Sequence, residues 1–321
     1  MKLIIQIPCY NEEKNLPATF QDLPRKIDGI DKIETLVIDD GSQDETAATA
    51  RRIGVDHVLS LKSHKGLASA FSEGIDRSLK LAADIIVNTD ADNQYAGDDI
   101  PQLVRPILDG KADVVVGIRQ VDRIAHFSWV KKRLIRWGSS VIRILSGTDI
   151  EDAVSGFRAF SKEAALRMNI LTNYSYTIEN LVQLGNQRLK IVSVPVRTNP
   201  KARESRLIKN VPHFLGQQLA TILRVYATYK ALKVFVTLGL IILLPGLMGF
   251  LRFLYFYMTG RGQGHIQSLI FSTALLLLGF LVLVFGVIAD LIGNNRKLIE
   301  KALYRIRKLE LDKTERTEDE D

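Results

Sequence analysis

Two long apolar stretches near the end of the chain limit its possible folds more than any other feature of the sequence. Residues 234–258 are apolar with few interruptions, and residues 268–292 are almost wholly apolar. As a helix, each stretch is long enough to cross a hydrocarbon core about 30 Å thick. A short glycine-rich link, residues 259–267, joins them. We therefore predict a two-helix transmembrane hairpin over residues 233–292.

The distribution of lysine and arginine around the hairpin predicts its orientation. The link carries only Arg261, whereas basic residues lie at both outer flanks: Lys230, Lys233, Arg296 and Lys297. Because basic flanks stay on the cytoplasmic side of a membrane, both chain ends are expected there. The single cysteine, Cys9, leaves no intrachain disulfide and fits a reducing compartment. We expect an integral membrane protein with two spans, a cytoplasmic N-terminal domain over residues 1–210 and a charged cytoplasmic tail over residues 293–321.

The N-terminal domain alternates short apolar runs with helical patterns. Strands are expected at residues 3–7, 34–38, 85–87, 114–116 and 190–196, and helices at residues 15–27, 44–53, 67–81 and 98–108. Strands separated by helices of this length indicate right-handed crossovers and an open, mostly parallel α/β sheet. In such sheets, ligands bind beyond the carboxyl ends of the strands.

Two carboxylates, Asp90 and Asp92, directly follow the expected strand at residues 85–87. Leaving a strand end one residue apart, they can aim two hard oxygen ligands at one point, which suits Mg²⁺ or Mn²⁺ with a diphosphate. The alternative is an acidic turn, since Asp and Asn favour turns. Two further polar clusters, residues 8–12 and 39–42, follow other strands and favour a shared site.

A basic segment, residues 119–147, interrupts the α/β pattern. Its seven cations alternate with apolar residues and two tryptophans: Arg119, Arg123, Lys131, Lys132, Arg133, Arg136 and Arg143. A basic amphipathic helix with tryptophan is typical of a membrane interface and suits anionic headgroups. The alternative is an ordinary helix whose apolar stripe faces the core. Residues 211–232 predict a second, juxtamembrane amphipathic helix.

Six motifs occur in one order along the chain. They read I-P-C-Y-N-E-E (7–13), V-I-D-D-G-S-Q-D-E-T (37–46), H-K-G-L-A-S-A (64–70), D-A-D-N-Q (90–94), V-V-G-I-R (115–119) and D-A-V-S-G-F-R-A-F (152–160). With them, the chain resembles the family 2 inverting glycosyltransferases, and among these the polyprenyl-phosphate sugar synthases of the dolichyl-phosphate mannose synthase type. The match runs from residue 5 to about residue 206, and the hairpin resembles that of bacterial members. Family members often have Leu at Asn93 and Ser at Ile118, and the second departure leaves the acceptor side less defined.

The resemblance implies a GT-A fold with an open mixed sheet, Mg²⁺ or Mn²⁺, a nucleotide-diphosphate sugar linked to UDP or GDP, and a polyprenyl phosphate acceptor. The donor nucleotide would be bound by Pro8, Tyr10, Glu12, Asp40, Lys65, Gly66 and Asp90. The metal would be bound by Asp90, Asp92 and Gln94, and the acceptor phosphate by Arg119, Arg133 and Arg203. Catalysis would depend on Asp90, Asp92 and Asp152.

The expected reaction is inverting attack by a polyprenyl phosphate oxygen on the anomeric carbon of the donor. A phosphate monoester has a second pKa near 6, so this nucleophile needs no general base. A sugar hydroxyl normally does need one. Asp152 is the nearest candidate for such a base, and our interpretation is that it orients arginines or the metal environment. It could instead cap a helix or a turn.

Other functions remain as alternatives. A family 2 enzyme with a lipid hydroxyl acceptor would use Asp152 as its base, and a non-catalytic, membrane-anchored sugar-nucleotide-binding module would not need an intact metal motif. A processive polysaccharide synthase is disfavoured because two spans cannot form a polymer channel in one chain. The pI near 9.3 alone would allow nucleic-acid binding, but the basic residues lie beside apolar faces rather than on a polar surface. Association into a homo-oligomer is left open.

Overall fold

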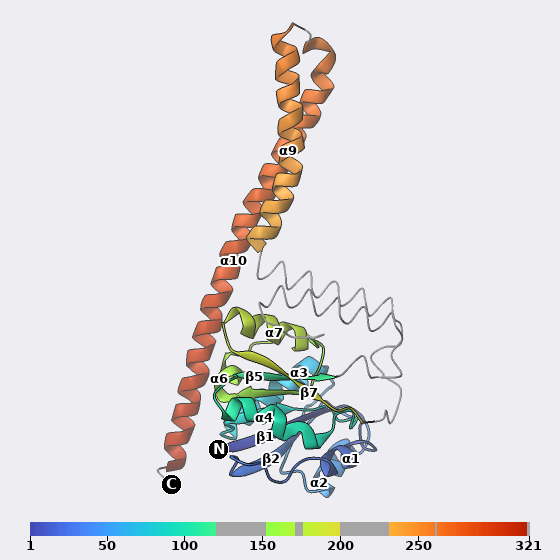
Figure 1. Ribbon diagram of the computed structural model, residues 1–321, viewed down its shortest axis with the longest axis vertical. Helices are drawn as coiled ribbons and strands as arrows, with labels where there is room; N and C mark the ends of the chain where they lie inside the picture. The colour runs from blue at the N-terminus through green and yellow to red at the C-terminus, as the bar shows by residue number, and fades with distance from the viewer. Residues whose placement is uncertain (120–151, 171–175, 200–230, 261, 320–321) are drawn as a thin grey trace. The chain divides into compact units, whose positions relative to one another are not determined.

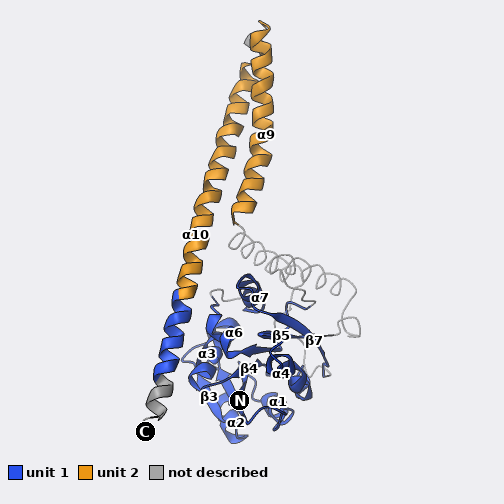
Figure 2. Ribbon diagram, turned by 60° about the vertical axis from the view of Figure 1, so that its left-hand side comes forward, with its two compact units in different colours: residues 1–218, 302–321 blue, residues 219–301 orange. Residues whose placement is uncertain are grey.

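The computed structural model describes residues 1–119, 152–170, 176–199, 231–260 and 262–319 (Figure 1). Of the expected amphipathic segments, 119–147 and 211–232, all but residues 119, 231 and 232 lie outside the described part of the chain. The chain forms two compact units (Figure 2). Unit 1 combines residues 1–218 with residues 302–321, and unit 2 contains residues 219–301.

Unit 1 is built around a seven-stranded sheet with the order β3-β2-β1-β4-β6-β5-β7. Its strands are β1 (Lys2–Cys9), β2 (Lys32–Asp39), β3 (His57–Ser60), β4 (Ile85–Asn88), β5 (Val114–Arg119), β6 (Arg158–Ser161) and β7 (Ile191–Val196). Strand β6 runs antiparallel to its neighbours β4 and β5, and the other described pairs are parallel. The expected open mixed α/β sheet is confirmed. The carboxyl ends of β1, β2, β4 and β5 therefore meet at one edge.

Helices connect these strands along the chain and pack against the sheet. They are α1 (Leu16–Gln21), α2 (Thr46–Arg52), α3 (Leu67–Lys80), η1 (Gly97–Asp99), α4 (Ile100–Leu108), α6 (Lys162–Arg167) and α7 (Tyr176–Asn186). Helix α1 is shorter than the helix expected at residues 15–27, because Pro24 disfavours helical geometry in the residue before it. Ser161 directly precedes α6, and its side chain caps the helix by accepting a hydrogen bond from the Ala164 amide at 3.2 Å.

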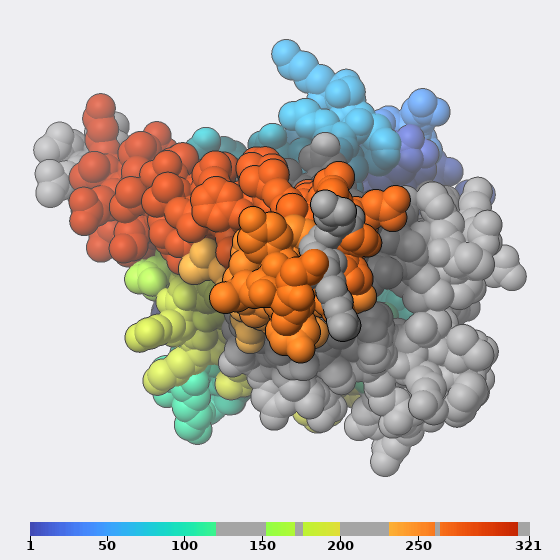
Figure 3. All heavy atoms as spheres, turned by 90° about the horizontal axis from the view of Figure 1, so that it is seen from above, coloured from blue at the N-terminus to red at the C-terminus, as the bar shows by residue number. Residues whose placement is uncertain are grey.

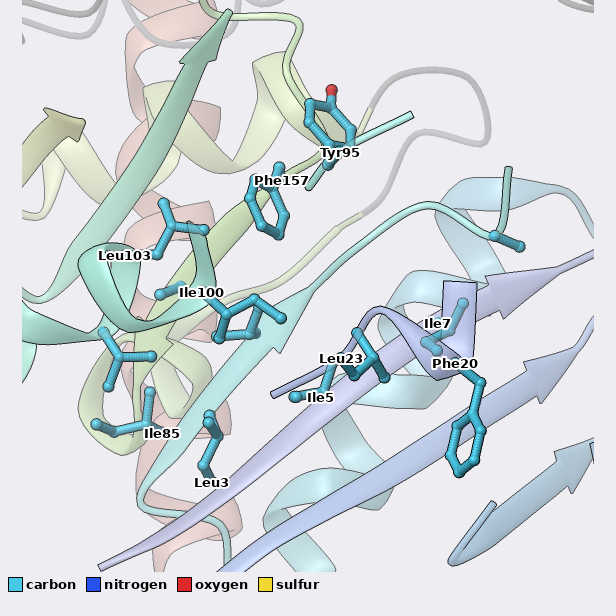
Figure 4. Packing of buried hydrophobic residues seen from close by; sticks show 14 of the residues in the cluster. Leu3, Ile5, Ile7, Phe20, Leu23, Ile85, Tyr95, Ile100, Leu103 and Phe157 are labelled. Atoms are coloured by element: carbon cyan, nitrogen blue, oxygen red, sulfur yellow. The ribbon is translucent and has the colours of Figure 1, made fainter. Parts of the chain in front are cut away.

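The apolar core lies between the sheet and the helices. Alternate residues of β1, Leu3, Ile5 and Ile7, share one cluster with Ile85 of β4 and with side chains from α1 and α4 (Figure 4). This alternation is the two-residue period of a strand. Ile4 of β1 is also fully buried, so the central strand is covered on both faces. Burial on both faces explains why these strands read as continuous apolar runs.

A charged cluster surrounds Glu34, in the first half of β2. Its carboxylate lies 2.7 Å from Lys2 Nζ, 2.6 Å from Lys32 Nζ and 2.8 Å from His57 Nε2. Burial raises the pKa of Glu34, but the hydrogen bonds from these three partners outweigh that effect and lower the pKa to about 2. Because β2 and β3 run parallel and His57 opens β3, this cluster lies toward the amino ends of the strands, away from the carboxyl edge.

Unit 2 contains α9 (Ala231–Met258), η3 (Gly262–His265) and the first part of α10 (Ile266–Asp319). Both long helices are apolar and long enough to cross a membrane. They pack closely at two glycines: a Cβ atom on Gly246 would lie 2.9 Å from Leu275 Cβ, and one on Gly279 would lie 2.8 Å from Leu243 Cβ. Large apolar side chains point outward along this hairpin, whose linked end faces the viewer in Figure 3 (orange).

The end of the chain belongs to unit 1. Tyr304 Oη donates to Glu163 Oε2 of α6 at 3.1 Å. Arg307 Nη1 donates to the Met168 carbonyl at 2.6 Å, and Arg307 Nη2 lies 3.2 Å from Asp76 Oδ1 of α3. Residues 302–313 are therefore an ordered helical segment held by α3 and α6.

Candidate active site

The candidate site lies at the carboxyl edge of the sheet, where each polar motif leaves a strand. Residues 10–12 follow β1, Asp40 follows β2 and residues 89–94 follow β4. Arg119 is the last residue of β5, and residues 152–157 lead into β6. The parallel pairing of β1 with β2 and β4 brings the first three motifs side by side. The antiparallel insertion of β6 between β4 and β5 brings the last two beside them.

The loop after β4 carries Asp90, Asp92 and Gln94. Burial and the neighbouring charge of Asp92 raise the pKa of Asp90 to about 7. Asp92 Oδ1 accepts a hydrogen bond from the Gln94 amide at 3.1 Å, and Asn93 between them has a left-handed φ of 53°. Asparagine tolerates that conformation better than most residues, which fits its presence at this turn.

The loop suits a hard divalent cation. The charge of Asp92 raises the pKa of Asp90, so a cation bound by both carboxylates would relieve their repulsion, and the amide oxygen of Gln94 could add a third oxygen donor. In the described part of the chain, no group of three or more His, Cys, Asp or Glu side chains is placed to hold a metal ion. Metal binding here would therefore depend on Asp90, Asp92, Gln94 and oxygens of the donor diphosphate.

A layer of buried polar side chains, formed by Gln6, Asn88 and Tyr176, lies next to the loop that carries Asp90. Asn88 Nδ2 donates to the Gly156 carbonyl at 2.8 Å and lies 3.3 Å from Tyr176 Oη. Gln6 Nε2 of β1 donates to Asn88 Oδ1 at 3.0 Å. Gly156 approaches Asp90 so closely that a Cβ atom on it would lie 3.1 Å from Asp90 Oδ1. These contacts hold the loop before β6 against the loop after β4 that carries Asp90.

Arg119 and Asp152 form an ion pair beside Asp90. Arg119 Nε donates to Asp152 Oδ2 at 2.7 Å, and Arg119 Nη2 donates to Asp152 Oδ1 at 3.1 Å. Burial lowers the pKa of Arg119, but Tyr95, Asp152 and Asp90 outweigh it and raise the pKa above its usual value. The guanidinium is therefore a permanent cation, held in place by a carboxylate that is itself buried.

Asp40, Tyr10 and residues 64–66 lie together at the end of the candidate site where the donor nucleotide is expected. Asp40 accepts hydrogen bonds from the amides of Lys65 and Gly66, both at 2.8 Å. Its Oδ2 also lies 2.8 Å from His64 Nδ1. The His64 ring stacks on Tyr10, with ring centroids 3.8 Å apart and planes at 22°. The structure thus brings the motifs at residues 7–13, 37–46 and 64–70 into contact.

This arrangement matches a known family. The glycosyl transferase family 2 profile matches residues 4–167. The chain belongs to glycosyltransferase family 2. It is 30% identical over 206 residues to the undecaprenyl-phosphate mannosyltransferase of Micrococcus luteus, covering 61% of this chain and 83% of the relative. It is 27% identical over 311 residues to the glycosyltransferase AglJ of Haloferax volcanii, covering 95% of this chain and 97% of the relative.

Solved structures confirm the fold of this glycosyltransferase. Glucosyl-3-phosphoglycerate synthase from Mycobacterium tuberculosis, in complex with Mn²⁺, UDP and phosphoglyceric acid, superposes with a TM-score of 0.54. The match is 19% identical and covers 70% of this chain and 77% of that one. At this identity it shows the GT-A-like fold alone. The Mn²⁺ and UDP belong to that enzyme.

The remaining predicted residues of the glycosyltransferase lie as follows. Pro8 is in β1, where it pairs with Ile38 of β2. The Glu12 carbonyl accepts the Leu16 amide at 3.0 Å at the start of α1, and Glu12 Oε2 accepts Asn15 Nδ2 at 2.7 Å. The two further predicted acceptor residues, Arg133 and Arg203, lie outside the described residues.

Arg158 is a site residue that sequence reasoning missed. It is fully buried, and burial lowers its pKa to about 10. Its guanidinium donates to the carbonyls of Ala153 and Ser155, both at 2.8 Å, and to the Thr177 carbonyl at 2.7 Å. It also donates to Asn180 Oδ1. Arg158 thus clamps the loop that carries Asp152. The motif at residues 152–160 contained it, but only the fold shows that it points inward.

His64 is the second missed residue. None of the histidines shows metal-ligand spacing, and the sequence gave no other reason to assign His64 a role. The available signal was its place directly before Lys65 and Gly66, two residues expected at the donor nucleotide. Its contact with Tyr10 depends on two distant turns meeting at the sheet edge.

Proposed function

We propose that this glycosyltransferase moves a sugar from a UDP- or GDP-linked donor to a polyprenyl phosphate, with inversion and with Mg²⁺ or Mn²⁺. One observation carries the proposal. Arg119, held by its ion pair with Asp152, lies close enough to Asp90 for its positive charge to favour the ionised form of that carboxyl group. A permanent cation that can bind an anionic acceptor thus shares one site with the carboxylates of the expected metal motif. The relative named undecaprenyl-phosphate mannosyltransferase supports the same acceptor class.

The donor is bound between two ends of the site. Tyr10, Asp40 and the amides of Lys65 and Gly66 would define the nucleoside end, whereas Asp90, Asp92 and Gln94 would hold the metal that binds the diphosphate. When bound, the metal neutralises the negative charge that grows on the leaving diphosphate. Arg158 and the buried polar layer keep these groups in place while charge moves.

Arg119 orients the acceptor phosphate. Its pair with Asp152 uses Nε and Nη2, so the Nη1 side of the guanidinium is directed away from that pair. A phosphate monoester is largely dianionic at neutral pH and attacks without a general base. Both Asp152 oxygens accept from Arg119, so Asp152 acts by positioning the arginine rather than by removing a proton.

The site is proposed to work at the cytoplasmic face of a membrane. Two helices, α9 and the first part of α10, are apolar and long enough to span it. The basic flanks of the hairpin support a cytoplasmic position for residues 1–210 and for residues 293–321. A polyprenyl phosphate presents its phosphate at headgroup level, where the basic segment at residues 119–147 would meet it.

The test is sugar transfer in detergent by the full chain. Labelled nucleotide sugars are offered with undecaprenyl phosphate and Mg²⁺ or Mn²⁺. We expect a charged lipid product stable to mild alkali, lost with EDTA. Asp92→Ala should lower the rate about a hundredfold or more, because it removes a metal ligand.

A matched control is Asp98→Ala, which removes a carboxylate that is 78% exposed. It should keep the wild-type rate. Donor hydrolysis without a charged lipid product, or transfer to diacylglycerol, would overturn the proposed acceptor.

A further inference from the structure

His64 occupies the place in which a donor base would be expected to bind. Its ring lies parallel to Tyr10 at 3.8 Å between centroids. Its Nδ1 lies 2.8 Å from Asp40 Oδ2, and with a carboxylate as the partner, the imidazole N–H must donate. Tyr10 and Asp40 are two of the residues expected at the nucleoside.

A nucleobase would use the same two contacts. Uracil and guanine are flat rings that carry a ring N–H, so either can stack on a tyrosine and donate to a carboxylate. Tyr10 and His64 are already in van der Waals contact, and no third ring fits between them. A base that takes the Tyr10 face covered by His64 and the Asp40 oxygen that His64 contacts must therefore displace His64.

The surroundings allow this exchange without unfolding. Asp40 is 2% exposed and accepts the amides of Lys65 and Gly66, so its carboxylate stays fixed when the imidazole leaves. The His64 side chain is 50% exposed and can rotate into solvent.

We propose that His64 is an internal substitute for the nucleobase, which the donor must displace, and that it thereby sets the enzyme's affinity for its nucleotide. This inference rests on the proposed donor site. In this role His64 lowers the affinity for the donor, because it competes with the donor base for Tyr10 and Asp40 and makes no contact with the bound base.

The experiment is titration of the full chain in detergent with UDP and with GDP, in the presence of Mn²⁺, by calorimetry. His64→Ala should bind the preferred nucleotide about tenfold more tightly, because a ring stack and a charge-assisted hydrogen bond no longer compete. His64→Phe keeps a ring but no N–H, and His64→Asn keeps an N–H but no imidazole ring. Both should fall between His64→Ala and wild type.

His57→Ala is the matched control, since it removes a histidine whose partner is Glu34 rather than Asp40. It should leave nucleotide affinity unchanged. Weaker or equal binding by His64→Ala would overturn the inference, because the imidazole would then support the base or ignore it.

The outcome separates this inference from the proposed function. Tighter nucleotide binding by His64→Ala, together with no sugar transfer to undecaprenyl phosphate, would support the role of His64 and overturn only the acceptor. Failure of wild type and all His64 variants to bind UDP or GDP would overturn both the donor site and the inference.

Discussion

Gly156 offers the sharpest test of the site geometry. A Cβ atom added there would lie 2.9 Å from Tyr176 Oη, 3.1 Å from Asp90 Oδ1 and 3.3 Å from Asp90 Oδ2. Gly156 is not among the glycines with a positive φ, so its backbone accepts alanine. Tyr176 is buried and stacked on Phe71 at 4.1 Å, and it cannot easily retreat. The added methyl group must therefore push Asp90.

The expected displacement is a few tenths of an ångström. Misplacement of a reacting group by about 1 Å can cost about a hundredfold in rate. Gly156→Ala should therefore reduce the transfer rate about tenfold to a hundredfold. Overpacking of the buried layer should also reduce the free energy of unfolding by about 1–3 kcal/mol. Because Asp90 is an expected metal ligand, the Mn²⁺ concentration for half-maximal rate should rise as well.

The assay is the rate of sugar transfer across a Mn²⁺ series, with the melting temperature measured in the same detergent. Gly117→Ala is matched in tightness: its Cβ would lie 3.1 Å from Phe157 Cδ1 and from Val196 Cγ1, with no carboxylate among its nearest atoms. It should lower the melting temperature without changing the Mn²⁺ requirement. If Gly156→Ala keeps the wild-type rate and Mn²⁺ requirement, Asp90 does not act at the place that the structure gives it.

Two further predictions concern Arg119 and Glu34. Arg119→Lys should raise the KM for undecaprenyl phosphate about tenfold or more, since lysine cannot bind Asp152 and a phosphate through one planar group; an unchanged KM would remove Arg119 from the acceptor site. Glu34→Gln should destabilise the fold by about 1–3 kcal/mol at pH 7, because its carboxylate has a pKa of about 2 in the fold against 4.5 ordinarily. A lowered pKa stabilises the fold above pH 4.5, and this effect is lost as the pH falls toward 2. The melting temperatures of wild type and Glu34→Gln should therefore converge at acid pH, and a constant difference would contradict the ion-pair argument.

The sheet was largely predictable because its central strands carry their own signal. β1 and β4 are buried on both faces, so they appear in the sequence as uninterrupted apolar runs between polar turns. Strands β3 and β6 escaped prediction. Each has four residues, and β6, with the sequence RAFS, includes an arginine. Its position between β4 and β5 depends on long-range antiparallel pairing, which no local pattern encodes.

The position of a candidate site residue was predictable where that residue lies at a strand end. Asp40, Asp90 and Arg119 all leave parallel strands at one edge, so topology alone brings them together. The roles of His64 and Arg158 depend on contacts between turns that lie far apart in the sequence. Periodicity and motif spacing carry no information about such contacts.

The docking of residues 302–313 on α3 and α6 affects how the catalytic unit can be made. Unit 1 is completed by a piece of chain that follows the apolar hairpin, so the ribosome finishes this unit only after both spans have emerged. A truncated protein that ends before α9, designed to be free of detergent, would lack Arg307 and would leave Asp76 of α3 without that partner. Gly66 directly precedes α3 as its N-cap residue and donates its amide to Asp40. A soluble version should therefore delete the hairpin and rejoin the last segment through a flexible linker.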